Sequence, residues 1–93
     1  MRIKIRTNII DDLLGPRGRD IILEKERATL KDLLGFLIRK YGKDLANRLL
    51  KDGQLKPDVV VMIGGSLPLR SRPLDSELND GVVVSILSIV AGG

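Results

Sequence analysis

The sequence predicts one α+β domain in which a helix packs on a mixed β-sheet. Three features support this fold class. The first residues alternate between apolar and basic side chains, residues 30–41 repeat apolar side chains at helical spacing, and residues 82–90 form an apolar, β-branched run. With 93 residues, the chain is long enough for one modest core and too short for two.

Two strands are expected before the helix. Ile3 and Ile5 lie on one face of the first strand, and the basic side chains between them lie on the other. The glycines and proline of residues 15–18 predict a loop, and residues 20–24 predict a second strand that pairs back on the first as a hairpin.

The helix has predicted boundaries at both ends. Thr29 is the expected N-cap, with Asp32 in the capping-box position where glutamate or glutamine is more common. Gly42 follows the last apolar residue and predicts a left-handed C-terminal cap. Between them runs one apolar stripe, which indicates the face that packs on the sheet. Its members are Leu30, Leu33, Leu34, Leu37, Ile38 and Tyr41.

The middle of the chain predicts shorter elements. Leu45 and Leu49 are four residues apart, which indicates a short second helical turn that ends near residues 52–53. Residues 54–57 are interpreted as a linker. The continuous β-branched run of residues 59–63 predicts a strand buried on both faces.

Two turns and a single helical turn are expected before the last strand. Gly64-Gly65 predicts a turn, and residues 67–69 predict a short edge strand because Pro68 donates no ladder hydrogen bond. Leu74 and Leu78 are interpreted as the residues that attach one helical turn to the core. Asp80-Gly81 is a turn dipeptide, and it introduces the predicted central strand of residues 82–90.

The composition excludes several kinds of chemistry. The chain has no cysteine, which excludes disulfides and thiolate metal sites, and no histidine, the commonest metal ligand and general base. The acidic residues do not form a pair in an apolar context that would separate their pKa values. We therefore expect neither an enzyme in its own right, nor a metal site, nor a bound cofactor.

The charge pattern gives expectations about partners and location. The chain carries 16 basic and 12 acidic residues, a net charge of +4, but the basic residues are scattered and aromatic residues make up 2%. A dense basic stripe with stacking aromatics is absent, so direct nucleic-acid binding is not expected. The N-terminus lacks the apolar core of a signal peptide, and no apolar run approaches the ~20 residues of a membrane span. These features predict a cytoplasmic protein without a membrane partner.

The C-terminal segment carries the most specific pattern. Asp80-Gly81 is followed by nine residues and then by Ala91-Gly92-Gly93. This spacing, together with the strand–strand–helix–strand order, resembles the sulfur-carrier branch of the ubiquitin-like β-grasp proteins. That branch includes the small subunit of molybdopterin synthase, the thiamin sulfur carrier, and the archaeal and eukaryotic ubiquitin-related modifiers.

The resemblance implies a fold and a division of the chain. Residues 1–90 are expected to form a ubiquitin-like β-grasp domain, an α+β fold with a mixed sheet of four to five strands and one main helix packed across it. Residues 91–93 are expected to form a flexible diglycine tail.

The resemblance also implies a function. An E1-like activating enzyme would use ATP to adenylate the carboxylate of Gly93, which would then be loaded as a thiocarboxylate. Gly92 and Ala91 would pass through a narrow channel of that enzyme, since glycine has no Cβ to clash there. The partner-contact residues would be Val90, Ile89 and Leu87.

The tail departs from the molybdopterin synthase subunit at residues 87–89. That family has phenylalanine-proline-proline there, whereas this chain has Leu-Ser-Ile, closer to the ubiquitin-related modifiers. Three functions therefore stay open. The first is a sulfur carrier for molybdopterin synthesis or tRNA thiolation, whose further partner would be the molybdopterin synthase large subunit or a tRNA-thiolation enzyme. The second is a modifier conjugated through Gly93 to lysines of target proteins, and the third is a non-covalent interaction module.

Overall fold

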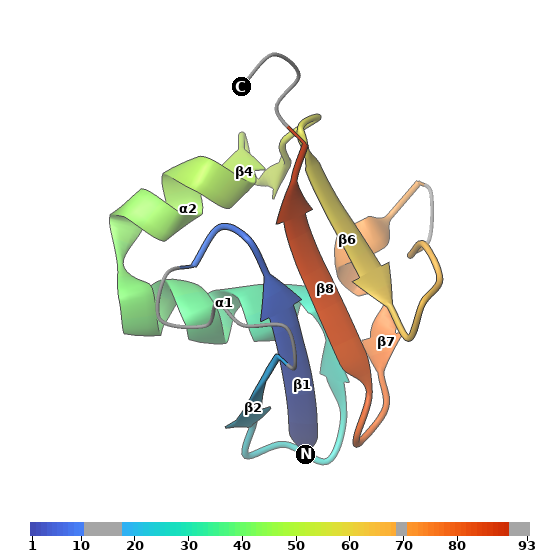
Figure 1. Ribbon diagram of the computed structural model, residues 1–93. Coiled ribbons are helices and arrows are strands. Elements are labelled where there is room, and N and C mark those ends of the chain that lie inside the picture. The colour runs from blue at the N-terminus through green and yellow to red at the C-terminus, as the bar shows by residue number, and fades with distance from the viewer. Residues whose placement is uncertain (11–17, 69–70, 90–93) are drawn as a thin grey trace.

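The computed structural model describes residues 1–10, 18–68 and 71–89 (Figure 1). The elements in chain order are β1 (Arg2–Thr7), β2 (Arg19–Ile22), β3 (Ala28–Thr29), α1 (Leu30–Tyr41), α2 (Lys43–Leu49), β4 (Leu50–Lys51), β5 (Gln54–Leu55), β6 (Val59–Ile63), the 3-10 turn η2 (Pro73–Asp75), β7 (Glu77–Leu78) and β8 (Val83–Ser88).

The main sheet has four strands in the order β2-β1-β8-β6. Strands β1 and β8 run parallel, with Ile5 opposite Val84, while β2 and β6 pair antiparallel with their neighbours. The last strand is therefore central, as predicted, and the sheet is mixed. Two short ribbons, β3–β7 and β4–β5, lie outside this sheet.

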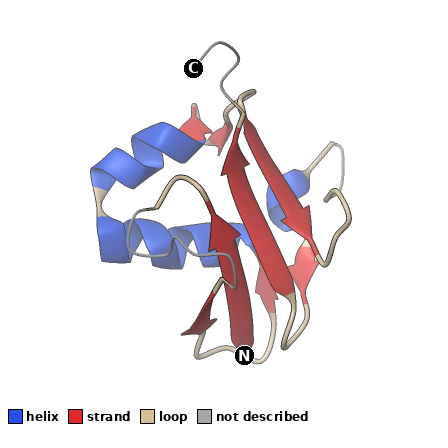
Figure 2. Ribbon diagram, viewed as in Figure 1, coloured by secondary structure: helices blue, strands red, loops and turns tan. Residues whose placement is uncertain are grey.

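Helix α1 covers one face of the sheet, and the two layers enclose an aliphatic core (Figure 2). Ile3 and Ile5 of β1 are fully buried, as the alternation predicted. The stripe of α1 is buried through its four leucines, whereas Ile38 and Tyr41 at its C-terminal end are partly exposed. The sheet therefore has a buried inner face and an outer face on the side away from α1.

The capping box of α1 is formed. The carboxylate of Asp32 accepts the backbone N–H of Thr29 at 2.9 Å, and the hydroxyl of Thr29 accepts the N–H of Asp32 at a longer 3.4 Å. At the other end, Gly42 donates its N–H to the carbonyl of Ile38 and has φ +90° and ψ −172°. The positive φ agrees with the predicted glycine cap, but the ψ value places Gly42 outside the left-handed helical region.

The prediction of a linker at residues 54–57 was wrong for residues 54–55 and agrees with the structure for residues 56–57, which lie in no helix or strand. Residues 54–55 form β5, which pairs with β4 in a hairpin whose two-residue turn is Asp52-Gly53. Both turn residues have positive φ, +54° and +78°, which an Asp-Gly pair accommodates. The sequence alone indicates this dipeptide only as the end of the second helical turn, which the structure shows as α2.

The prediction that residues 59–63 are buried on both faces was also wrong, because only one face of β6 is buried. Val59 and Val61 face the core and are buried, whereas Val60 and Met62 face the outer side and are partly exposed. The run is continuously apolar because the outer face itself is apolar here, and no described helix or strand covers it.

The expected edge strand at residues 67–69 is not formed by the described residues. Leu67 and Pro68 lie outside any strand, with Leu67 71% exposed, while residue 69 falls outside the described part of the chain. The predicted helical turn is η2, which contains Leu74. Leu78 lies instead in β7 and is buried opposite Ala28 of β3.

Within the described residues, the helices are too short and too polar to cross a lipid bilayer.

Candidate functional site at the C-terminal end of β8

The candidate site begins where β8 leaves the sheet. Strand β8 is paired on both sides, to β1 as far as Ile86 and to β6 as far as Ser88. Because β8 runs parallel to β1, both strands finish at the same end of the sheet (Figure 1). The two inner-facing residues Val84 and Ile86 are fully buried, so the strand that precedes the tail is fixed in the core.

Hydrogen bonds continue on both sides of the chain beyond the β1 pairing. The side-chain amide of Asn8 accepts the N–H of Ser88 at 2.8 Å and donates to the carbonyl of Ser88 at 3.1 Å. On the other side, the N–H of Ile89 donates to the carbonyl of Asp58 at 2.8 Å. The chain is thus held up to residue 89.

Two of the predicted partner-contact residues lie in the described region. Leu87 is partly exposed on the outer face, opposite Val60 of β6, and Ile89 is 59% exposed just beyond the strand. The remaining site residues predicted from the sequence lie outside the described residues: Val90, Ala91, Gly92 and Gly93. Both side chains are thus at least partly exposed at the C-terminal end of β8, and their contact with a partner stays a prediction.

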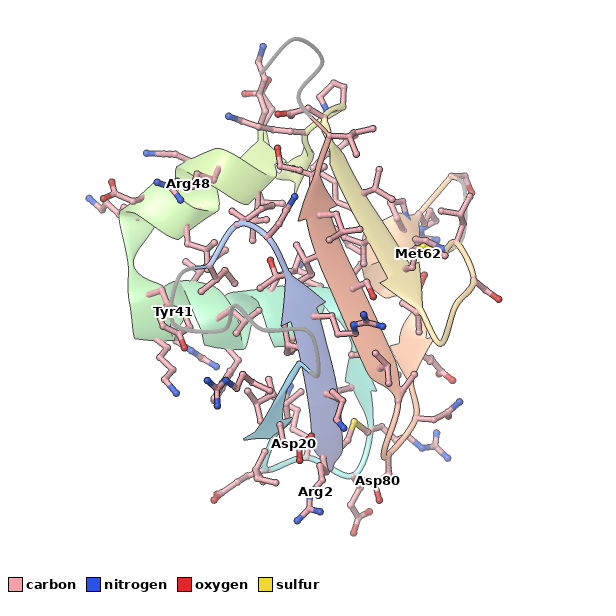
Figure 3. All side chains as sticks on the ribbon, viewed as in Figure 1. Arg2, Asp20, Tyr41, Arg48, Met62 and Asp80 are labelled. Atoms are coloured by element: carbon pink, nitrogen blue, oxygen red, sulfur yellow. The ribbon has the colours of Figure 1, made fainter. Side chains whose placement is uncertain are left out.

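The outer face has two chemically different halves. The apolar half lies on β8 and β6 and, apart from Ser85, consists of partly exposed apolar side chains, namely Val83, Leu87, Val60 and Met62. The basic half is on β1, where Arg2, Lys4 and Arg6 alternate with the buried isoleucines. Figure 3 shows Arg2 near Asp20 and Asp80 at the far end of the sheet, and Met62 on the β6 side.

The one described carboxyl group with a clearly lowered pKa has a structural explanation. The backbone N–H of Thr29 and, next, the Lys25 ammonium at 3.1 Å lower the pKa of Asp32. A hollow of about 490 Å³ nearby is lined by Asp32, Met1 and Asp80, among others. Asp80 precedes β8, so this hollow lies at the end of the sheet opposite Ser88 and is not part of the candidate site.

Sequence reasoning missed Asn8 and the carbonyl of Asp58. Asn8 and Ser88 are 80 positions apart, and an asparagine after a strand is common, so no local pattern indicates the contact. Only the parallel pairing of β1 with β8 brings the two residues together.

The mixed four-stranded sheet with a helix across one face defines a ubiquitin-like β-grasp protein. The chain shares this fold with the Haloferax volcanii HVO 2177 protein (TM-score 0.76, 31% identity, 100% of this chain and 87% of that one). It shares it also with Urm1 from Trypanosoma brucei (TM-score 0.67, 26% identity, 99% and 95% covered).

The chain belongs to the ThiS family, whose sequence pattern matches residues 10–93. It is 34% identical over 74 residues to a proposed sulfur carrier protein of Archaeoglobus fulgidus, covering 80% of this chain and 84% of the relative. It is 39% identical over 66 residues to small archaeal modifier protein 3 of Haloferax volcanii, covering 71% of each chain. These relatives are described as carriers and modifiers.

Proposed function

We propose that this chain is a ubiquitin-like sulfur carrier whose reacting group is the carboxylate of Gly93. In the first step, a carboxylate oxygen attacks the α-phosphorus of ATP in an E1-like activating enzyme, and pyrophosphate leaves. The terminal sulfur of a persulfide then attacks the acyl carbon and AMP leaves, giving an acyl disulfide. A thiol reduces this disulfide, which releases the thiocarboxylate and a mixed disulfide.

The observation that carries this proposal is the family match, which extends through residue 93 and so includes the diglycine. The identity of 34% to a protein described as a proposed sulfur carrier supports the same function. The described structure supports it because the last residues of the central strand β8 are held on both sides.

In this proposal, the chain itself binds the activating enzyme and presents its C-terminal carboxylate to the nucleotide site. The apolar half of the outer face and Ile89 would meet the activating enzyme, while Ala91 and Gly92 would pass to its nucleotide site. The chain itself would catalyse no step and hold no cofactor, and the ATP would be used by the activating enzyme.

Intact-mass measurement tests the proposal. The full chain is incubated with an E1-like activating enzyme, ATP and a persulfide sulfur donor, followed by a thiol. We expect a mass gain equal to the replacement of one oxygen by sulfur, absent without ATP and absent in a Gly93 deletion. An unchanged mass while the enzyme still binds the chain would contradict the proposal and favour the non-covalent interaction module.

A second candidate function, protein modification, is favoured by the identity to small archaeal modifier protein 3. In this case Gly93 would form isopeptide bonds with lysines of target proteins. The chain has no lysine or arginine after Arg72, so trypsin would leave a long remnant on the target lysine. An Ala91→Arg variant would shorten the remnant to Gly-Gly. Conjugates that carry this remnant, and that disappear in the Gly93 deletion, would support the modifier function.

The recipient of the sulfur is a separate question. Within the sulfur-carrier proposal, the partner would be the molybdopterin synthase large subunit or a tRNA-thiolation enzyme. Restored molybdenum-enzyme activity in a strain that lacks the synthase small subunit would support the pterin route. Restored tRNA thiolation without restored molybdenum-enzyme activity would support the other route.

A further inference from the structure

Asn8 extends the pairing of β8 with a side chain instead of a strand. The parallel pairing of β1 with β8 ends at Thr7 opposite Ile86. One residue later, Asn8 makes two hydrogen bonds to the backbone of Ser88, one through each end of its carboxamide. A carboxamide presents a donor and an acceptor much as a peptide group does, so it can substitute for a strand residue.

The position of Asn8 is fixed independently of Ser88. The next two residues, Ile9 and Ile10, are buried in the core. The N–H of Ile9 donates to the hydroxyl of Thr7 at 3.1 Å, and the guanidinium of Arg48 on α2 donates to the carbonyl of Ile9 at 3.1 Å. The core and α2 therefore keep the backbone next to Asn8 in place, and the side chain of Asn8 holds Ser88 from this fixed position.

The contact lies where the sheet ends and the proposed reactive segment begins. On the opposite side, Ser88 pairs with Val59 and Ile89 bonds to Asp58, so β6 alone would still attach the strand to the sheet. Asn8 is exposed, and so its hydrogen bonds bury little surface. The second attachment therefore contributes less to the fold than to the position of Ser88 at the end of β8.

We propose that Asn8 is a positioning residue that fixes the backbone of Ser88 at the point where β8 ends and the proposed reactive segment begins. This inference rests on the proposed function. An activating enzyme must bind the C-terminal segment in one conformation to place the Gly93 carboxylate at its nucleotide, and a chain that is held in a pre-set conformation loses less entropy on binding. Asn8 lowers that cost by keeping Ser88 in the strand conformation before the enzyme binds.

The test compares Asn8→Ala with the unchanged chain as substrates of the activating enzyme, with pyrophosphate release as the readout. Loss of the two bonds is expected to raise KM by about threefold to tenfold, as for a lost hydrogen bond. The kcat is expected to stay unchanged, because the reacting atoms are the same once the tail is bound. Amide exchange at Ser88 and Ile89 is expected to become faster.

Two control variants separate positioning from general loss of stability. Thr29→Ala removes the N-cap of α1 and destabilises the fold away from the tail, and Asn47→Ala removes an exposed asparagine of α2. Both are expected to keep the KM of the unchanged chain. The conservative variant Asn8→Asp keeps an acceptor for the Ser88 N–H but loses the donor, so its KM is expected to lie between those of Asn8→Ala and the unchanged chain.

The outcomes distinguish this inference from the proposed function. If the unchanged chain is never activated, the proposed function fails. If the unchanged chain is activated and Asn8→Ala has the same KM, or if Thr29→Ala raises KM as much as Asn8→Ala does, the positioning role of Asn8 is wrong while the proposed function stands.

Discussion

At the scale of single residues, Gly18 shows why a glycine is required between β1 and β2. Its φ is +74°, and a Cβ built on it would lie 2.8 Å from the carbonyl oxygen of Ile5. Gly53 has a similar φ of +78°, but a Cβ there would have no heavy atom within 4 Å. The two positions share a backbone conformation and differ in their surroundings.

Alanine at these two glycines should therefore have unequal effects. Gly53→Ala is expected to cost about 1–2 kcal/mol in the free energy of unfolding, because an L-residue disfavours positive φ. Gly18→Ala is expected to cost more, because the new methyl group would also clash with a backbone oxygen that the β1–β8 pairing holds in place. Urea unfolding of both variants measures the difference. Equal losses would show that the chain near Gly18 relaxes without cost.

At the scale of elements, helix α1 begins with a charged capping box. Its acidic member, Asp32, has a lowered pKa in the folded chain because its carboxylate accepts the N–H of Thr29 and lies beside Lys25. In the unfolded chain these contacts are lost and the pKa returns to its ordinary value near 3.8. The ionised carboxylate therefore stabilises the folded state fully above that pH, and this contribution is lost as the pH falls through the folded-state pKa.

This linkage predicts a pH-dependent effect of Asp32→Asn. The variant is expected to be less stable than the unchanged chain at pH 7, and the difference should shrink as the pH is lowered below about 4. Urea unfolding at several pH values checks this expectation. Asp44→Asn, in the first turn of α2 where no side chain caps the helix, controls for the loss of one negative charge. A difference that stays constant down to low pH would contradict the linkage.

The same elements show how far the sequence predicts the fold. The β1 alternation, the α1 stripe and the capping box depend on neighbours within a few residues, and each was predicted correctly. The burial of β6 was not, because an apolar run does not reveal whether a second layer covers it. The β4–β5 hairpin was missed although Asp52-Gly53 is a strong hairpin signal. Here the two-residue strands were too short to show alternation.

In the candidate site too, local features were predictable from the sequence and long-range contacts were not. The diglycine and the Asp80-Gly81 spacing are local patterns, and the family match agrees with them. The Asn8–Ser88 contact depends on a parallel pairing between the two ends of the chain, which no local pattern contains. Long-range pairing decides which polar residues meet, and for this reason the positioning residue emerged only from the structure.

At the scale of the whole molecule, the sheet has one face buried against α1 and one face that is partly exposed. The apolar half of the outer face borders the end of β8, so an activating enzyme that binds this half would lie next to Ser88 and Ile89. Leu87 is central to this arrangement, since it lies on β8 opposite Val60 and two residues before Ile89. Its side chain points away from α1, so the core does not depend on it.

Leu87→Ser should therefore weaken binding of the activating enzyme more than it weakens the fold. We expect the dissociation constant to rise about tenfold, as for one of the minority of interface residues that carry most of the binding energy. The matched control is Ile22→Ser, which removes a 53% exposed apolar side chain of the same face from the opposite edge strand. Ile22 pairs with Arg2 at the far end of the sheet, so this variant should bind as the unchanged chain does. Titration calorimetry with the full chain measures both constants. Unchanged binding by Leu87→Ser would place the docking surface elsewhere, whereas equal weakening by both variants would extend it over the whole outer face.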